Sequence, residues 1–266
     1  MSNIPPVISD ILSNSGNSFH YKVVRYFRDN GWSVLVSPYY SDNITNKPRE
    51  IDIIAEKKFE YHTFPNTYVG EICIRLFIEC KKISLNTLFW FDGLNEEKTI
   101  GRIAEDLEIT STHDSDFHTK HHYYLQKQVA KLFESENKRE PDNEIIYKAI
   151  NQSLNSLIYF RNTDSILPEN EQSNIIFTLN YPVIVCDGYQ KCFKVDTDKT
   201  EIEQITDVFQ AEINYAFIDV DNNKKNEFFI VDIVSFEKLK QYLDALNEHD
   251  VTALRTKMEW YGHFAK

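Results

Sequence analysis

The spacing of apolar residues predicts a helix close to the start of the chain. Between residues 16 and 30, Phe19, Val23, Tyr26 and Phe27 recur every three or four positions, with lysine, arginine and aspartate between them. Apolar residues at this spacing form one face of a helix, and the glycine that follows is a common helix terminator. We therefore expect an amphipathic helix that ends just before the first strand.

Short apolar runs after this helix predict three strands. They cover residues 32–36, 50–56 and 71–81, and a polar loop is expected between residues 40 and 49. Successive side chains of a strand point to opposite faces. The acids at the start of the second strand should therefore share one face with Ile54, while the apolar residues between them fill the other face.

The pattern after residue 82 predicts further helices and strands around this core. Residues 92–118 are polar and predict a loop or lid with a short helix at 97–107. Longer helices are expected over 121–134 and 143–160. Strands are expected over 174–179 and 182–186, and over 192–195 after a turn at Gly188. A hairpin of 213–220 with 227–234 is expected next, followed by a last helix capped by Ser235.

No repeat or low-complexity linker divides the chain. We therefore expect a single α/β domain, with a mixed sheet, over residues 1–266. Its core should span about residues 16–83, and residues of about 120–248 should elaborate that core with helices and strands.

Three charged residues stand out within the predicted strands. Asp52 interrupts the apolar run of the second strand, and Glu79 and Lys81 share one face near the end of the third. A buried carboxylate is costly unless it is paired or binds a cation. One explanation is an ion pair at the strand end, with Lys81, Arg49 or Arg75 as the partner. The other is a site for Mg²⁺, which prefers a few carboxylate oxygens together with water and phosphate oxygens.

This arrangement resembles the PD-(D/E)XK, or restriction-endonuclease-like, superfamily of nucleases. Asp52 matches the single aspartate of the motif and Glu79-Cys80-Lys81 matches its (D/E)-x-K, with helix and strand context over roughly residues 16 to 83. The bare E-x-K triplet is common by chance, so the context carries the resemblance. The resemblance implies a restriction-endonuclease-like fold. It also implies an endonuclease that hydrolyses the phosphodiester bonds of DNA and requires Mg²⁺ or Mn²⁺ as its cofactor.

The resemblance also implies roles for single residues. Asp52, Glu79 and the backbone carbonyl of Cys80 would bind the metal ion, and Lys81 would orient the attacking water or stabilise the transition state. Glu50 could assist through a water molecule.

One position departs from the family pattern. Many members carry a glutamate on the first helix, and His20 stands at the matching place. Histidine is a poor ligand for Mg²⁺ but a usable one for Mn²⁺. His20 is therefore either an accessory ligand or a structural residue, and a two-metal mechanism is disfavoured.

The overall charge argues against a protein that coats nucleic acid. The formal net charge is −12, and the excess of acids lies mainly after residue 140. Positive residues nevertheless gather near the candidate ligands, where they either attract substrate phosphates or form a solvated strand end. These candidate substrate-binding residues are Lys47, Arg49, Lys57 and Lys82, with Lys58 beside them.

A group of histidines offers a second candidate metal site. His118 and His122 stand four residues apart, with His113, His121, Asp114 and Asp116 close by in the sequence. Such spacing suits a transition metal, but no cysteine and no H-E-x-x-H motif accompany it, which favours a mobile polar loop. Gln126, Gln128 and Gln152 are noted because relatives sometimes carry a glutamine near the active site, although chance explains their placement as well.

The remaining features limit the function classes. The four cysteines form no CxxC pair, and neither a signal sequence nor a membrane span is recognised, so we expect a cytoplasmic protein with no membrane association. The chain has only seven glycines and no G-x-S-x-G motif, which argues against a phosphate-loop nucleotide-binding protein and against a serine hydrolase. Expected partners are nucleic acid and either a second copy of the chain or another protein. Two alternatives stay open: a catalytically inactive binding module of the same fold, and an acidic partner-binding protein.

Overall fold

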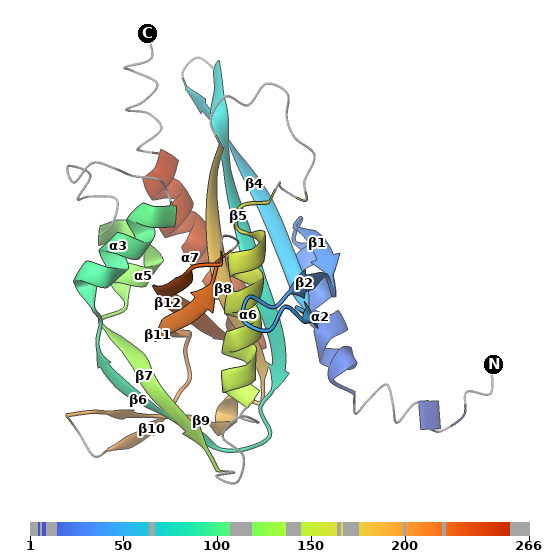
Figure 1. Cartoon of the computed structure of the whole chain (residues 1–266), viewed down its shortest axis with the longest axis vertical. Helices are drawn as coiled ribbons and strands as arrows, with labels where there is room; N and C mark the ends of the chain where they lie inside the picture. The colour runs from blue at the N-terminus through green and yellow to red at the C-terminus, as the bar shows by residue number, and fades with distance from the viewer. Residues whose placement is uncertain are drawn as a thin grey trace.

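A single mixed sheet runs through the molecule (Figure 1). We describe residues 5, 7–8, 15–63, 67–106, 119–136, 145–163, 166, 176–198, 201–219 and 222–255 of a computed structural model. The strands follow one another across the ten-stranded sheet as β1 (Ser33–Val36), β4 (Ile53–Thr63), β5 (Thr67–Lys82), β8 (Ile176–Asp187), β12 (Lys224–Ser235), β11 (Phe209–Ile218), β7 (Gln128–Ser135), β6 (Thr87–Gly93), β9 (Cys192–Asp196) and β10 (Ile202–Gln204).

The sheet is mixed because some connections run through helices and others through turns. β1, β4 and β5 form an antiparallel meander, and β5, β8 and β12 then run parallel to one another. β11 returns antiparallel to β12, and the pairs β11–β7 and β6–β9 are parallel. A separate two-stranded hairpin consists of β2 (Tyr39–Ser41) and β3 (Pro48–Glu50).

Helices cover both faces of the sheet. The described α-helices are α2 (Gly16–Asp29), α3 (Glu96–Asp106), α5 (His122–Leu125), α6 (Ile145–Phe160) and α7 (Leu239–Ala245). Shorter turns of 3-10 helix span Tyr189–Lys191 and Phe236–Lys238, and a π-helical turn spans Leu246–Val251. None of these described helices has the length and apolarity needed to cross a membrane.

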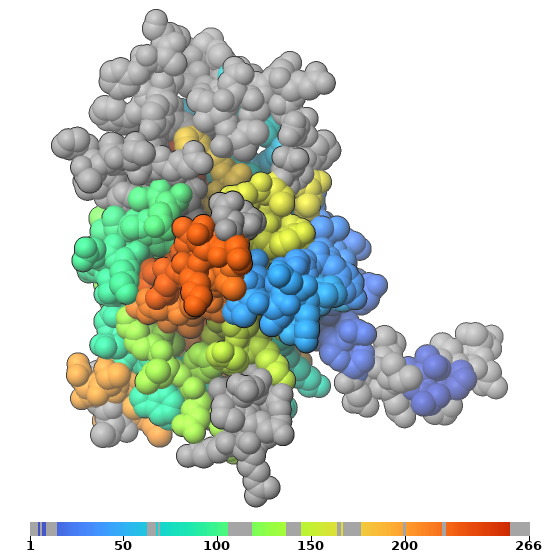
Figure 2. Space-filling view, in the orientation of Figure 1, coloured from blue at the N-terminus to red at the C-terminus, as the bar shows by residue number. Residues whose placement is uncertain are grey.

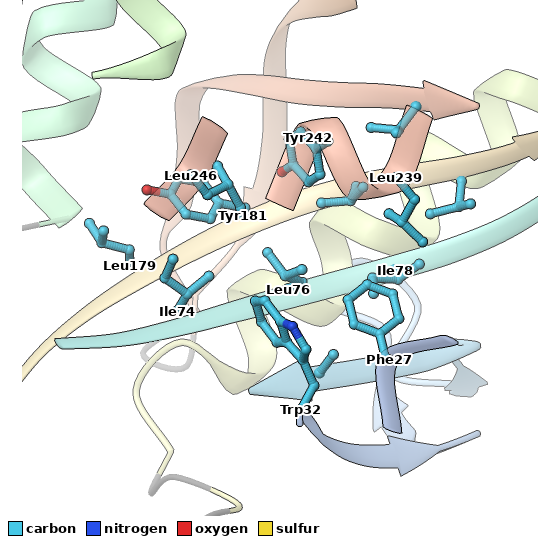
Figure 3. Close-up of a cluster of buried hydrophobic side chains, with 14 of the residues drawn as sticks. Phe27, Trp32, Ile74, Leu76, Ile78, Leu179, Tyr181, Leu239, Tyr242 and Leu246 are labelled. Atoms are coloured by element: carbon cyan, nitrogen blue, oxygen red, sulfur yellow. The ribbon is translucent and has the colours of Figure 1, made fainter. Parts of the chain in front are cut away.

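Alternate residues of β5 divide the core into two parts. Ile74, Leu76 and Ile78 face the side covered by α2 and α7, and Figure 3 shows them between Phe27 of α2 and Leu239 of α7. On the other side, Phe77 packs with α6 and with residues of β6, β8 and β11. Because both faces are covered, the central strands read as nearly continuous apolar runs.

α6 is enclosed on the second side of the sheet. In the space-filling view, the β2–β3 hairpin lies beside the β11–β12 strands on the surface (Figure 2). The Tyr40 hydroxyl donates to the Gln152 carbonyl at 3.3 Å, and the Asn43 amide donates to the Asn155 carbonyl at 3.1 Å. The hairpin therefore fastens the outer side of α6, and polar residues of this helix such as Ser153 and Asn155 are buried.

Several predicted elements are confirmed. The helix of residues 16–30 is α2, the helix of 143–160 is α6, and the short helix near 97–107 is α3. The predicted hairpin of 213–220 with 227–234 is β11 and β12, and the Ser235 hydroxyl accepts the Lys238 N–H at the start of the last helical segment. The coarse class, α/β with a mixed sheet, is likewise confirmed.

Other predictions of local structure are wrong. The helix expected over 121–134 is the short α5 followed by strand β7, and the two strands expected over 174–179 and 182–186 are one strand where described, β8. The polar loop of 40–49 contains most of the β2–β3 hairpin, and strand β6 was not foreseen.

The strand expected over 50–56 is also divided. Glu50 ends β3, residues 51 and 52 connect the two sheets, and β4 begins only at Ile53. Ile51 consequently packs on the α6 side with Ile54, whereas Ile53 packs on the α2 side. The predicted alternation therefore fails before Ile53, because the backbone turns there from one sheet into the other.

Candidate active site

Strand register brings Asp52 and Glu79 together. β4 and β5 are antiparallel, with Ile53 opposite Ile78, so the residue before β4 lies next to Glu79. The Cys80 N–H donates to Asp52 Oδ2 at 2.7 Å, which holds the Asp52 carboxylate against the β5 backbone. Both acids thus meet where β4 begins and β5 approaches its end.

Hydrogen bonds from two other segments fix the backbone of Asp52. Its carbonyl accepts the Ser37 N–H at 2.9 Å and His20 Nε2–H of α2, also at 2.9 Å. A ring nitrogen that donates to a carbonyl keeps its proton and cannot bind a metal ion. In this structure His20 therefore positions the Asp52 backbone through Nε2.

Glu79 and Lys81 form a buried pair on the α6 side of the sheet. Lys81 Nζ lies 2.6 Å from Glu79 Oε2, and the Glu79 side chain is fully buried. Lys81 Nζ also donates to Gln152 Oε1 of α6 at 3.4 Å, and Gln152 Nε2 donates to the Glu50 carbonyl at 3.2 Å. One glutamine thus links the lysine to the chain segment that carries Asp52.

The ionisation of Glu79 reflects this environment. Burial raises the pKa of Glu79 to about 8, and the negative charge of Asp52 adds to the rise, whereas the Lys81 ammonium and the Asp52 backbone N–H oppose it. Burial lowers the pKa of Lys81, but the charge and hydrogen bond of Glu79 outweigh this effect and leave it raised. A carboxyl of raised pKa beside a second carboxylate is stabilised in its ionised form by a cation.

The donor set fits a hard divalent cation, but access to it is narrow. Two carboxylates and the neighbouring peptide carbonyl are oxygen ligands of the kind that Mg²⁺ and Mn²⁺ use. The Lys81 side chain keeps 21% of its surface exposed. Neither of the two large described cavities, of about 690 and 930 Å³, is lined by Asp52, Glu79 or Lys81, although Lys82 lines the larger one.

Glu50 lies apart from this cluster. Its carboxylate accepts a hydrogen bond from the Tyr39 hydroxyl across the β2–β3 hairpin, which raises the pKa of Tyr39. The backbone of Glu50, rather than its carboxylate, is what reaches Gln152.

The candidate substrate-binding cations are dispersed. Lys47 and Lys82 are exposed, and Arg49 lies 3.7 Å from Asp42 on the β2–β3 hairpin. Lys57 donates to the Asn30 carbonyl at the end of α2 and stands five residues beyond Asp52, about 16 Å along a strand. Lys58, which was grouped with them, pairs with Glu71 at 3.2 Å. Of this set, Arg49 and Lys82 lie nearest to the acids in the chain, and only Lys82 directly follows Lys81.

A second cluster of ionisable groups lies on the α2 side of the sheet. Ligand atoms of His121, His122 and Asp250 fall within 4.8 Å of one another, a spacing that could hold a metal ion. Both histidines are buried, so the polar loop predicted for this region is wrong at these two positions. His113, Asp114, Asp116 and His118 lie outside the described residues.

Hydrogen bonds already occupy the lone pairs of this cluster. His122 Nδ1 donates to Asp250 at 2.5 Å and its Nε2 donates to Asp232 at 3.2 Å, while His121 Nδ1 accepts the Tyr123 N–H at 3.2 Å. Burial opposes the charged form of His122, but Asp250 and Asp232 outweigh it and raise its pKa to about 10. Burial alone would raise the pKa of Asp250, yet the neighbouring imidazoles and hydrogen bonds lower it to about 2. The histidines and aspartates of this cluster thus form a hydrogen-bond network without a metal ion.

Sequence reasoning missed most of the groups that surround these two clusters. The sequence did not distinguish Gln152 from Gln126 and Gln128. Of the three, Gln152 binds Lys81, whereas Gln126 and Gln128 line the 690 Å³ cavity. Asp232 and Asp250 carried no signal because the histidine that they share, His122, lies more than a hundred residues away. The position of Gln152 in an apolar helix was the one available indication, since an amide on a buried helix face requires a partner.

Comparisons with models of protein families, with curated proteins and with solved structures found no match. The function of the site is therefore inferred from its own residues.

Proposed function

We propose that the chain is a divalent-metal-dependent endonuclease of restriction-endonuclease-like fold that hydrolyses phosphodiester bonds in DNA. The observation that carries the proposal is the convergence of Asp52 and Glu79 with the Lys81 ammonium 2.6 Å from Glu79. The order of elements supports it: a helix, then an antiparallel meander whose last strand ends in the acid and the lysine.

Each residue then has a defined task. Asp52, Glu79 and the Cys80 carbonyl would hold Mg²⁺ or Mn²⁺, which polarises the scissile phosphate and lowers the pKa of a bound water. Lys81 donates to the attacking water or to the phosphate oxygen on which charge develops. Gln152 and His20 are positioning residues, because they bind the lysine and the Asp52 backbone.

One observation favours an inactive relative of the same fold. Glu79 is fully buried, and Lys81 Nζ lies 2.6 Å from its Oε2, so the lysine offsets the buried charge without a metal ion. In such a binding module the acids and the lysine would only stabilise the end of the sheet. The two functions differ in how they respond to metal and to loss of the lysine.

The first experiment measures the response to metal. Mg²⁺ or Mn²⁺ should raise the melting temperature of the wild type, because a ligand that binds only the folded state stabilises it. Asp52→Asn should abolish this rise and should also abolish cleavage of plasmid and linear DNA. A metal-induced rise that is unchanged in Asp52→Asn would move the metal site elsewhere.

The second experiment separates enzyme from binding module. Lys81→Ala should lower the cleavage rate on the order of a hundredfold while binding of DNA changes little, because the lysine acts mainly in the transition state. Lys225→Ala removes a lysine at the far end of the sheet and serves as the control. Full activity of Lys81→Ala would exclude the catalytic role, and absence of cleavage by the wild type with both metals would favour the binding module.

A further inference from the structure

A cavity of about 930 Å³ adjoins the candidate active site on the α2 side. Its walls include the outer face of α2, with Tyr21, Lys22 and Arg25, and the end of β5 at Lys82. Tyr21 follows His20, which binds the Asp52 backbone, and Lys82 follows Lys81. The cavity lining and the candidate active site are therefore neighbours in the chain at two places. Lys82 and Lys81 point to opposite faces of β5, so a strand bound in the cavity reaches Lys81 by passing the end of β5.

The charge of this cavity is opposite to that of the chain. Lys22, Arg25 and Lys82 line it together with two acids, Asp29 and Asp187, whereas the whole chain carries 41 acidic against 29 basic residues. No ion pair of Arg25 or Lys82 occurs among the described residues, and the Lys22 ammonium lies over the Phe236 ring at 3.9 Å. Three cations against two acids give the lining a positive balance, which attracts phosphates.

An exposed aromatic ring stands beside these cations. The Tyr21 side chain is 65% exposed, and Arg25 is four residues further along α2, so both lie on the same face of the helix. The Tyr21 ring is therefore accessible to a ligand. A tyrosine face with neighbouring cations forms a stacking platform for a nucleic-acid base whose phosphates are held alongside.

These features select single-stranded nucleic acid over an intact duplex. Bases of a duplex are stacked on one another and present no free face to a protein ring, whereas an unpaired base can stack on tyrosine. The apolar part of the wall, formed by Phe19, Tyr26 and Phe236, suits an unstacked base and not a phosphate backbone alone.

We propose that this cavity, lined by Tyr21, Lys22, Arg25 and Lys82, binds a single-stranded segment of the substrate and leads it to Asp52, Glu79 and Lys81. The inference rests on the proposed nuclease function and narrows its substrate to nucleic acid with unpaired strands, such as single strands, flaps or frayed ends. The cations hold consecutive phosphates, and Tyr21 stacks on a base beside them.

The experiment measures binding without cleavage. A fluorescein-labelled DNA strand of about 16 nucleotides, the upper end of typical single-strand site sizes, is titrated by anisotropy in EDTA, alone and annealed to its complement. The wild type should bind the single strand on the order of tenfold more tightly than the duplex at low salt. A uridine-rich RNA of the same length shows whether the sugar matters.

Variants locate the binding surface. Lys22→Ala with Arg25→Ala should lower single-strand affinity on the order of tenfold and reduce the salt slope by about 1.4, because two phosphate contacts are lost. Tyr21→Ala should weaken binding on the order of tenfold, whereas Tyr21→Phe retains the ring and should bind as the wild type does. Lys224→Ala with Lys225→Ala is the control, because it removes the same two positive charges elsewhere on the surface. Lys225 lies ten residues before Ser235, the β12 residue alongside the end of β8, or about 33 Å along the strand.

The outcomes separate this proposal from the nuclease proposal. Equal affinity of the Lys22→Ala, Arg25→Ala variant and the control, or tighter binding of duplex by the wild type, overturns the single-strand path even if metal-dependent cleavage occurs. Binding of single strands that depends on the cavity residues, without any cleavage, would support the single-strand path and exclude the endonuclease function. Circular dichroism of each variant verifies that the fold is intact before binding is compared.

Discussion

Glu79 dominates the ionisation of the candidate site at the level of single residues. Burial raises its pKa to about 8, above the value near 4.5 that holds in the unfolded chain. Between these two pH values the folded protein binds a proton that the unfolded chain has lost. Stability must therefore fall as pH rises from about 4.5 to 8, by at most about 1.4 kcal/mol per pH unit from this group.

This ionisation can be measured by comparing Glu79→Gln with the wild type. The free energy of unfolding of the wild type should decline more steeply between pH 5 and 8 than that of the variant, because glutamine has no proton to lose. His122, with its raised pKa of about 10, adds a decline above pH 6.5, but it is present in both proteins and cancels in the difference. Urea unfolding at several pH values gives the two slopes.

Metal provides an internal check on the same pair of proteins. Saturating Mg²⁺ or Mn²⁺ favours the ionised form of Glu79, so the steeper decline of the wild type should disappear when metal is present. Parallel pH profiles of the two proteins in EDTA would show that Glu79 is ionised in the folded protein without metal.

Gly188 determines how two central elements end. It joins β8 to the following turn with φ of 87°, and a Cβ at this position would lie 2.2 Å from the Ile83 carbonyl oxygen. Ile83 directly follows β5, and its N–H donates to the Asp187 carbonyl at 2.7 Å. The ends of β5 and β8 therefore meet at a point where only glycine fits.

Gly188→Ala should thus cost more than a backbone penalty. Gly31→Ala is the matched control, because Gly31 also has a positive φ, of 74°, but nothing lies within 4 Å of its added Cβ. The control should lose about 1 kcal/mol of unfolding free energy, and Gly188→Ala a further 1–3 kcal/mol or so from the collision. Similar losses of unfolding free energy in both variants, measured by urea unfolding, would mean that the backbone at Ile83 moves to accommodate the added Cβ.

Strand β7 shows why local periodicity can mislead. Leu125, Val129 and Leu132 have helical spacing, yet only Val129 is buried, while Leu132 is 66% exposed. The parallel pairing of β7 with β11 and its antiparallel pairing with β6 override the local pattern, and these partners lie elsewhere in the sequence.

A pair of substitutions on β7 tests this arrangement. Val129→Ala should lower the free energy of unfolding by about 1–2 kcal/mol, because it opens a cavity in the core, whereas Leu132→Ser should change it by less than about 0.5 kcal/mol. On a helical stripe both changes would be costly. Thermal and urea unfolding of the two variants distinguish these outcomes.

The parts that sequence could predict are those set by neighbours along the chain. α2 and α6 follow from their apolar stripes, and Asp52, Glu79 and Lys81 meet because two adjacent strands pair in register. The contact of Gln152 with Lys81 and that of Asp232 with His122 depend instead on residues that are 71 and 110 positions apart in the sequence. No periodicity records such contacts, so their geometry had to come from the structure.

At the level of the whole molecule, one sheet joins the predicted core to its elaboration. β8 pairs parallel to β5 and β12 pairs parallel to β8, and the sheet continues from there to β10. The segment of residues 16–83 therefore shares its central hydrogen bonds with strands from the second half of the chain. Such continuity predicts unfolding as one cooperative unit.

Two tryptophans near opposite ends of the sheet can report on this cooperativity. Trp32 precedes β1, and Trp90 lies on β6. In a Trp260→Phe background, one variant retains only Trp32 and the other only Trp90. In each variant the urea midpoint by fluorescence should equal the midpoint of the same variant by far-ultraviolet circular dichroism. Midpoints that differ by more than the error would divide the chain into two independently folding units.

The pairing of β5 with β8 also sets the moment at which the site forms during synthesis. A ribosome that has just added Lys81 has made all three charged groups, but α6 and β8 are still to come. In that nascent chain β5 lacks its parallel neighbour, Glu79 lies in water with an ordinary acidity, and Lys81 has no Gln152 to bind. The arrangement of Asp52, Glu79 and Lys81 that carries the proposed nuclease function is therefore incomplete until residues 176–187 emerge and pair with β5.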